Sequence, residues 1–271
     1  MRQLLLLCVL FNVAAQAEPN PQRIVALAPH ITEMLYAIGA GDRLVAVSDY
    51  SDFPSEAQTL PRVASYASVN IEAVLALKPD LVIAWRTGNP QSDIKRLQQF
   101  GVNVAFSDPI TLEDIAKELR MIGKRVGMQD IANEEANRFT RQLSALRSKY
   151  QHKAPVPVFF AMGTAPVSTV ANNAWPQQML TLCAADNTFR NVKGDYPQVG
   201  IEQVVAARPE VIIQPVRPNF AADFSFWQRF VTLPAVQKHQ FLSVNADYLY
   251  RTTPRTLLGI QQLCEGVDAF R

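Results

Sequence analysis

The sequence contains one pattern twice, once in each half of the chain. Residues 70–85 read NIEAVLALKPDLVIAW, and residues 200–215 read GIEQVVAARPEVIIQP. A helix does not easily pass through the proline, and the apolar β-branched run that follows it suits a buried parallel strand. Each copy therefore predicts a short helix, a turn and a strand. Two such copies in one chain predict two similar α/β lobes.

A helix of unusual length is predicted between the two copies. Apolar residues recur at spacings of four and three, which places them on one face of a helix: Ala132, Ala136, Phe139, Leu143, Leu146 and Tyr150. No Gly or Pro interrupts residues 129–151, which would extend roughly 35 Å at a rise of about 1.5 Å per residue. The expected fold class is α/β, with two similar Rossmann-like lobes joined by one long rigid α-helix and a ligand cleft between the lobes.

These features give an expected domain organisation. It consists of a signal peptide at 1–17, an N-terminal α/β lobe at 18–127, a linking helix at 128–152 and a C-terminal α/β lobe at 153–271. Shorter patterns add strands at 23–28, 44–48 and 156–162, and helices beginning near Thr32 and Glu33, at 175–182 and after Thr253. In the last helix, Thr253 is the expected N-cap and Pro254 the expected first helical residue.

The segment 1–17 reads as a secretory signal peptide. Arg2 precedes an apolar run over residues 4–13, and Ala15-Gln16-Ala17 supplies the small residues of a cleavage site. The apolar run is too short to span a bilayer. We expect cleavage after Ala17 and export of the remaining chain. The alternative interpretation of this segment is an N-terminal core strand.

Two of the three cysteines are expected to remain after cleavage. Cys8 lies within the predicted signal peptide, whereas Cys183 and Cys264 lie far apart in the sequence of the second lobe. An even number of cysteines in an exported protein favours a disulfide. The alternative is a pair of buried free thiols.

Composition excludes several classes of protein. Hydrophobic residues make up 48% and charged residues 18% of the chain, which is typical of a globular protein and not of a disordered chain, a collagen or a coiled coil. The charges nearly cancel, with 26 Lys and Arg against 24 Asp and Glu, so no nucleic-acid partner is expected. No apolar run of about 18 or more residues occurs in the body of the chain, so a polytopic membrane protein is not expected.

Motifs of common enzyme classes do not occur in the sequence, including G-x-S-x-G, H-E-x-x-H, the P-loop and C-x-x-C. His30, His152 and His239 are scattered and do not cluster with carboxylates as zinc ligands do. We therefore expect no enzyme activity, no catalytic residue, no metal site and no cofactor. The alternative is an exported enzyme whose catalytic residues only the fold brings together.

Aromatic residues occur where predicted strands and loops meet. Tyr50 follows the strand at 44–48, and Trp85 ends the first repeat. Tyr66 and Tyr196 stand at equivalent positions before the two repeats. Because ligands of open α/β sheets bind beyond the carboxyl ends of the strands, this matched pair indicates a cleft for a large planar ligand. Ordinary half-buried packing is the alternative.

Glu72 and Glu202 form a second matched pair, because each opens the helix of one repeat. A carboxylate in the first turn gains from the helix dipole, which by itself is sufficient to account for both. The functional interpretation is a pair of docking sites, one per lobe. Two related sites on one rigid body would bind a basic partner with two-fold symmetry.

Four stretches carry a resemblance to a known family: YSDFPSEAQ at 50–58, NIEAVLALKPDLVIAWR at 70–86, YPQVGIEQV at 196–204 and TPRTLLGIQQLC at 253–264. They resemble the periplasmic cobalamin (vitamin B12)-binding components of ABC importers in Gram-negative bacteria. The resemblance covers essentially the whole chain after the signal peptide. It implies capture of cobalamin or another corrinoid in the periplasm and delivery to the permease dimer in the inner membrane, by a monomer.

The resemblance also implies roles for individual residues. Tyr50, Asp247 and Arg251 match positions that line the corrin cleft. Glu72 and Glu202 match the two glutamates that dock onto the permease. Cys183 and Cys264 match the disulfide of the family.

The sequence departs from the family at several positions. Tyr66 and Tyr196 stand where the best-known member has tryptophans, and Ser168 stands where it has a phenylalanine. His30 is also not the residue of that member, and we hypothesise that it faces the ligand and approaches the cobalt; a satisfied polar loop residue is the alternative. Haem, with His30 as a ligand, and ferric siderophores, bound by cleft arginines, are the alternative cargoes of the same protein class.

Overall fold

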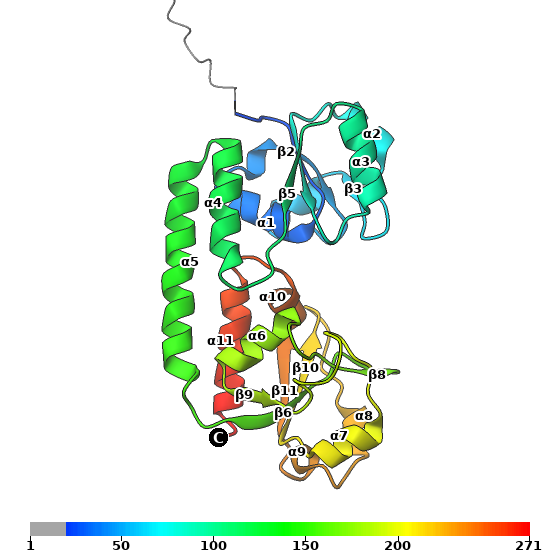
Figure 1. Cartoon of the computed structure of the whole chain (residues 1–271), viewed down its shortest axis with the longest axis vertical. Helices are drawn as coiled ribbons and strands as arrows, with labels where there is room; N and C mark the ends of the chain where they lie inside the picture. Colours follow the sequence, from blue (N-terminus) through cyan, green and yellow to red (C-terminus); the bar gives the residue numbers. More distant parts are fainter. Residues whose placement is uncertain (1–19) are drawn as a thin grey trace, which may run out of the picture.

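The computed structural model describes residues 20–271 of the chain, so the predicted signal peptide at 1–17, with Cys8, lies outside the described residues. Two lobes, each built around a parallel sheet, are joined by one long helix that runs alongside both of them (Figure 1). The predicted two-lobe α/β fold is confirmed. Within residues 20–271, no helix combines the length and the apolar character needed to cross a membrane.

The N-terminal lobe has a five-stranded parallel sheet in the order β3-β2-β1-β4-β5. Its strands are β1 (Ile24–Ala26), β2 (Leu44–Ser48), β3 (Arg62–Ala64), β4 (Leu81–Trp85) and β5 (Val104–Ser107). Its helices are α1 (Pro29–Ala37), η1 (Gly41–Arg43), η2 (Ser55–Thr59), α2 (Ile71–Ala76), α3 (Gln91–Gln99) and α4 (Asp114–Val126). Alternate residues of β1 and β4 are buried against α1 and α4 on one face of the sheet, and against α2 and α3 on the other.

The C-terminal lobe has a four-stranded parallel sheet in the order β11-β10-β6-β9, and a small hairpin. Its strands are β6 (Val156–Phe160), β7 (Gly163–Thr164), β8 (Val167–Ser168), β9 (Ala185–Asn187), β10 (Val211–Val216) and β11 (Phe241–Asn245). Its helices are α6 (Trp175–Leu182), α7 (Ile201–Ala207), α8 (Ser225–Gln228), α9 (Pro234–Gln237), α10 (Ala246–Tyr250) and α11 (Thr256–Asp268).

The two sheets share one topology. Strands β2-β1-β4-β5 of the first sheet correspond in order to β9-β6-β10-β11 of the second, and β3 is an addition to the first. The sequence repeat corresponds to α2 with β4 in one lobe and to α7 with β10 in the other. The repeat therefore marks equivalent elements of two similarly built lobes.

The linking helix α5 (Gln129–Tyr150) is packed along its whole length. Its predicted apolar stripe is buried, except that Leu146 is partly buried. The stripe packs on α4 of the N-terminal lobe and on α6 and α11 of the C-terminal lobe. One apolar cluster therefore continues from the first lobe through α5 into the second, which opposes hinge motion between the lobes.

Two predicted helix starts are wrong. Helix α1 begins at Pro29 rather than near Thr32, because proline fits the first helical turn, where its missing N–H is not needed. Helix α11 begins at Thr256 rather than at Pro254. The Thr253 hydroxyl accepts a hydrogen bond from the backbone N–H of Arg255 at 3.2 Å, which closes a separate turn before the helix.

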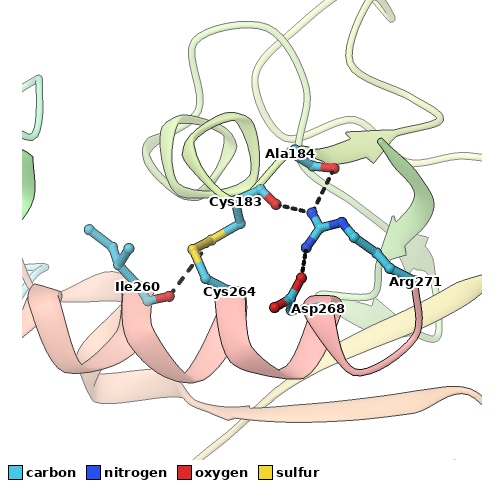
Figure 2. The surroundings of a disulfide bond; sticks show 6 residues. All are labelled: Cys183, Ala184, Ile260, Cys264, Asp268 and Arg271. Atoms are coloured by element: carbon cyan, nitrogen blue, oxygen red, sulfur yellow. Dashed lines mark hydrogen bonds and ion pairs between the residues drawn. A yellow bond between two sulfur atoms is a disulfide. The ribbon is translucent and has the colours of Figure 1, made fainter. Parts of the chain in front are cut away.

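The predicted disulfide joins Cys183, at the end of α6, to Cys264 in the middle of α11 (Figure 2). Arg271 adds a second connection between these elements. Its guanidinium donates to the Cys183 carbonyl oxygen at 2.6 Å and pairs with Asp268 at 2.7 Å. The disulfide and this guanidinium together fix α11 to the rest of the C-terminal lobe.

Candidate ligand-binding cleft

A cleft of about 630 Å³ lies between the lobes, beyond the carboxyl ends of β2, β6, β10 and β11. This is the edge at which open parallel sheets bind ligands. Tyr50 and Asp52 line it from the N-terminal lobe, and Asp247 and Arg251 line it from the C-terminal lobe. The structure thus brings together three residues singled out in the sequence, Tyr50, Asp247 and Arg251.

A network of hydrogen bonds presents Tyr50 to the cleft. Arg62 donates to the carbonyl oxygens of Ser48 and Ser51 at 2.9 and 2.7 Å, and the Ser51 hydroxyl accepts from Thr32 at 3.1 Å. These bonds fix a turn in which Tyr50 has a positive φ of 62°. The Tyr50 side chain is 67% exposed, so its ring is free to contact a ligand.

Arg251 is engaged by three carboxylates from both lobes. Its guanidinium lies 2.6 Å from Asp52, 3.0 Å from Glu33 and 3.2 Å from Asp247. Burial opposes the charge, but these carboxylates outweigh it and raise the pKa of Arg251. Burial also raises the pKa of Asp247, against the opposing effect of Arg251. The positive charge of Arg251 is therefore already compensated within the protein.

Further residues of the cleft had not been predicted. Phe220 follows β10, is 71% exposed and lines the cleft together with Arg217 and Tyr250. The position of Phe220 beyond a strand end is the same signal that singled out Tyr50. Burial, and then the neighbouring Tyr196, raise the pKa of Tyr250, so its phenol stays protonated at neutral pH.

Trp85 and His30 form an edge-to-face pair at the carboxyl edge of the first sheet. Trp85 is 38% exposed, and its indole N–H donates to Asp108 at 3.1 Å. The His30 ring packs edge-on against the indole, with the two ring centroids 5.5 Å apart, and His30 is only 5% exposed. Its Nε2 lies 3.3 Å from the Ser107 hydroxyl. Burial lowers the pKa of His30 to about 4, and Asp108 opposes this only in part.

Tyr66 and Tyr196 occupy exposed turns and do not line the 630 Å³ cleft. Tyr66 is 86% exposed at the tip of a turn whose backbone N–H groups are bound by the Ser65 hydroxyl. Tyr196 is 54% exposed and near Tyr250, which does line the cleft. That Tyr66 and Tyr196 flank a large planar ligand therefore stays a prediction.

Ser168 belongs to the hairpin beside the cleft. Its carbonyl oxygen accepts from the backbone N–H of Met162 at 2.9 Å, and it forms an isolated bridge with Gln198. Met162 lines the cleft. Ser168 thus helps to place the cleft wall through its backbone.

Glu72 and Glu202 lie in the first turns of α2 and α7, at equivalent positions of the two lobes. Both side chains are exposed. Asn70 caps α2 through its side chain, and the Gln203 side chain accepts from the backbone N–H of Gly200 before α7. The two glutamates are therefore presented on well-formed helix starts.

The cleft has the composition of a binding site. Exposed aromatic rings form its walls. Three of its charged groups, Asp52, Asp247 and Arg251, pair with one another, and Arg217 lies outside this cluster. Between residues 20 and 271, no group of three or more His, Cys, Asp or Glu side chains is arranged to hold a metal ion.

Comparison with known proteins agrees with this architecture. The vitamin B12-binding protein of Vibrio vulnificus (strain YJ016) is 38% identical over 266 residues, which are 98% of this chain and 96% of the relative. The crystal structure of the periplasmic vitamin B12 binding protein BtuF of Vibrio cholerae is similar with a TM-score of 0.83 and 38% identity, over 93% of this chain and 98% of that chain.

More distant structures share the fold. The periplasmic heme-binding protein RhuT from Roseiflexus sp. RS-1 is similar with a TM-score of 0.82 at 22% identity, over 92% of this chain and 99% of that chain. Residues 24–248 match the family of periplasmic binding proteins. With this match and with 38% identity to a relative over almost its whole length, the chain belongs to the periplasmic binding protein family.

Proposed function

We propose that this protein captures cobalamin in the periplasm and delivers it to the permease of an ABC importer. Relatives and a solved structure that are 38% identical over nearly the full chain are named for vitamin B12 binding. The cleft between the lobes is the binding site. The protein binds the ligand and presents it to the permease without changing it chemically.

The compensated charge of Arg251 is the observation that carries the choice of cargo. Of the two arginines that line the cleft, Arg251 is paired with three carboxylates and only Arg217 lies outside this cluster. A strongly anionic ferric siderophore would require several free cleft cations. Haem would require an axial His or Tyr ligand. His30 is buried beneath Trp85, so haem would depend on a tyrosine of the cleft such as Tyr50. Cobalamin presents uncharged amide side chains around a large planar ring. Paired charges can hydrogen-bond such amides, and the aromatic walls can cover the ring.

The proposed contacts extend the set predicted from the sequence. Tyr50, Asp247 and Arg251 contact the ligand, together with Phe220 and Tyr250. Tyr66, Trp85 and Tyr196 contact the parts of the ligand that project beyond the cleft. His30 acts beneath Trp85 by holding the indole in place.

Delivery uses the matched pair of glutamates. We place Glu72 and Glu202 against basic side chains of a two-fold symmetric permease dimer, which a monomer would bridge with one glutamate per half. Residues 1–17 direct export and are removed after Ala17.

Calorimetric titration of residues 18–271 tests the proposed cargo. Cyanocobalamin, dicyanocobinamide and haemin are titrated in parallel. We expect tight one-to-one binding of cyanocobalamin and much weaker binding of haemin. Tight haemin binding without corrinoid binding would mean that the cargo is wrong.

A further inference from the structure

Glu33 is a buried carboxylate that the proposed ligand contacts do not use. It lies in α1 of the N-terminal lobe, and its side chain is only 3% exposed. A carboxylate removed from water to this extent is costly unless it is paired and hydrogen-bonded. Both of its ionic partners, Arg251 and Arg255, belong to the C-terminal lobe.

The contacts of Glu33 cross from one lobe to the other. Its Oε1 lies 3.0 Å from Nη1 of Arg251, and its Oε2 accepts from Nε of Arg255 at 2.9 Å. The Arg255 guanidinium also lies 3.7 Å from the ring centroid of Phe53, another residue of the N-terminal lobe. One carboxylate therefore holds two guanidinium groups of the opposite lobe.

The two arginines face different cavities. Arg251 lines the ligand cleft, whereas Arg255 lines a separate groove of about 370 Å³, which Glu33 also lines. Glu33 therefore holds Arg251 from the side away from the ligand. Asp52 and Asp247, in contrast, line the ligand cleft themselves.

The arginines are carried by a rigid part of the C-terminal lobe. They lie between α10 and α11, and the Thr256 hydroxyl donates to the Arg251 carbonyl oxygen at 2.8 Å. The disulfide to Cys264 fixes α11 to α6. The contact with Glu33 therefore connects α1 to a segment that hydrogen bonds and the disulfide hold in place.

We propose that Glu33 is a positioning residue of the ligand cleft, which fixes the Arg251 guanidinium against its wall and makes the cleft selective for an uncharged polar ligand. This inference rests on the proposed function. The cluster of three carboxylates and two arginines carries a formal charge of −1. Removing the charge of Glu33 leaves it neutral and frees a donor of Arg251, which favours an anionic ligand.

Gln178 provides a matched control. It also joins the lobes, because its amide accepts from the backbone N–H of Leu112 at 3.1 Å and donates to the Ile110 carbonyl oxygen at 2.8 Å. It lines a different cavity between the lobes and not the ligand cleft. Gln178→Ala therefore loosens the lobes without changing the surroundings of Arg251.

The test compares ligand affinities of three variants of residues 18–271 by calorimetry, with cyanocobalamin and haemin as probes. For Glu33→Gln we expect the affinity for cyanocobalamin to fall by about tenfold or more, on the scale of a broken buried charge pair, and the affinity for haemin to rise. Glu33→Asp retains the charge and should be intermediate. Gln178→Ala should bind both probes within about twofold of the wild type.

The outcomes separate the inference from the proposed function. A wild-type protein that binds no cyanocobalamin overturns the proposed function. A wild-type protein that binds it, with an unchanged ratio of the two affinities in Glu33→Gln, overturns the role of Glu33. Equal losses of cyanocobalamin affinity in Glu33→Gln and Gln178→Ala would also overturn it, because Glu33 would then only connect the two lobes. If Glu33→Gln does not fold, the same ratio is measured on Glu33→Asp.

Discussion

Side chains around the cleft divide into those that meet the ligand and those that hold them in place. Tyr50 and Phe220 present exposed rings, whereas Arg62 fixes the turn that carries Tyr50. His30 lies beneath Trp85 and does not line the cleft. Substitutions in the two groups should therefore separate affinity from stability.

His30 should make stability depend on pH. Its pKa is about 4 in the fold and about 6.5 when unfolded, so the unfolded chain binds more protons between these values. Stability is then complete above pH 6.5 and falls as the pH drops towards 4, by at most about 3 kcal/mol. Urea unfolding of wild type and His30→Asn across this range measures the effect. The difference between them should change in this window, and parallel profiles would contradict it.

Phe220 should contribute to affinity and hardly to stability. Its ring is 71% exposed, so Phe220→Ala should change the free energy of unfolding by no more than about 0.5 kcal/mol. Loss of one aromatic contact should weaken cyanocobalamin binding about tenfold, or about 1.4 kcal/mol. Phe100→Ala is the matched control, because Phe100 is 61% exposed and lies outside the cleft. Equal affinities of the two variants for cyanocobalamin would show that Phe220 does not contact the ligand.

At the scale of elements, α11 follows directly on the segment that contributes Arg251 to the cleft. The segment before it carries Arg251 and Arg255, and Cys264 fixes it to α6. Helix α5 and the repeated helix–strand segments were predictable, because apolar periodicity and the repeat can be seen in the local sequence. The starts of α1 and α11 were not, since each depends on turn geometry around a proline.

The candidate site was predictable only in part, for a related reason. Asp247 and Arg251 were implied only by the family resemblance, whereas Tyr50 was also indicated by its position after a predicted strand. Glu33 had no signal, because its partner Arg251 is distant in the sequence, at a separation of 218. Phe220 follows a strand end, as Tyr50 does, but no family motif marks its segment.

Loss of the disulfide should destabilise the C-terminal lobe. Cys183 and Cys264 have a sequence separation of 81, for which chain entropy gives up to about 4.5 kcal/mol. We expect Cys183→Ala/Cys264→Ala to lower the free energy of unfolding by an amount up to this value. Denaturant unfolding without reductant measures it, with the reduced wild type as the parallel control. An unchanged midpoint in both would contradict a stabilising disulfide.

At the scale of the whole molecule, the continuous core along α5 should keep the lobes at a fixed separation. The apolar cluster passes through α5 from one lobe to the other, and Glu33 and Gln178 add polar bridges between the lobes. These contacts predict a carrier that presents its cargo without a large hinge closure.

Small-angle scattering tests this rigidity. Profiles of residues 18–271 with and without saturating cyanocobalamin should superimpose, because the packed helix resists closure. A marked decrease of the radius of gyration on binding would show that the lobes close like a hinge.

The most direct test of the proposed cobalamin site is a crystal structure of residues 18–271 with cyanocobalamin. We predict the corrin ring between the lobes, with Tyr50 on one side, Phe220 and Tyr250 on the other, and Arg251 still bound to Glu33. A corrin ring bound elsewhere, or a cleft that opens by breaking the Glu33–Arg251 contact, would contradict this account.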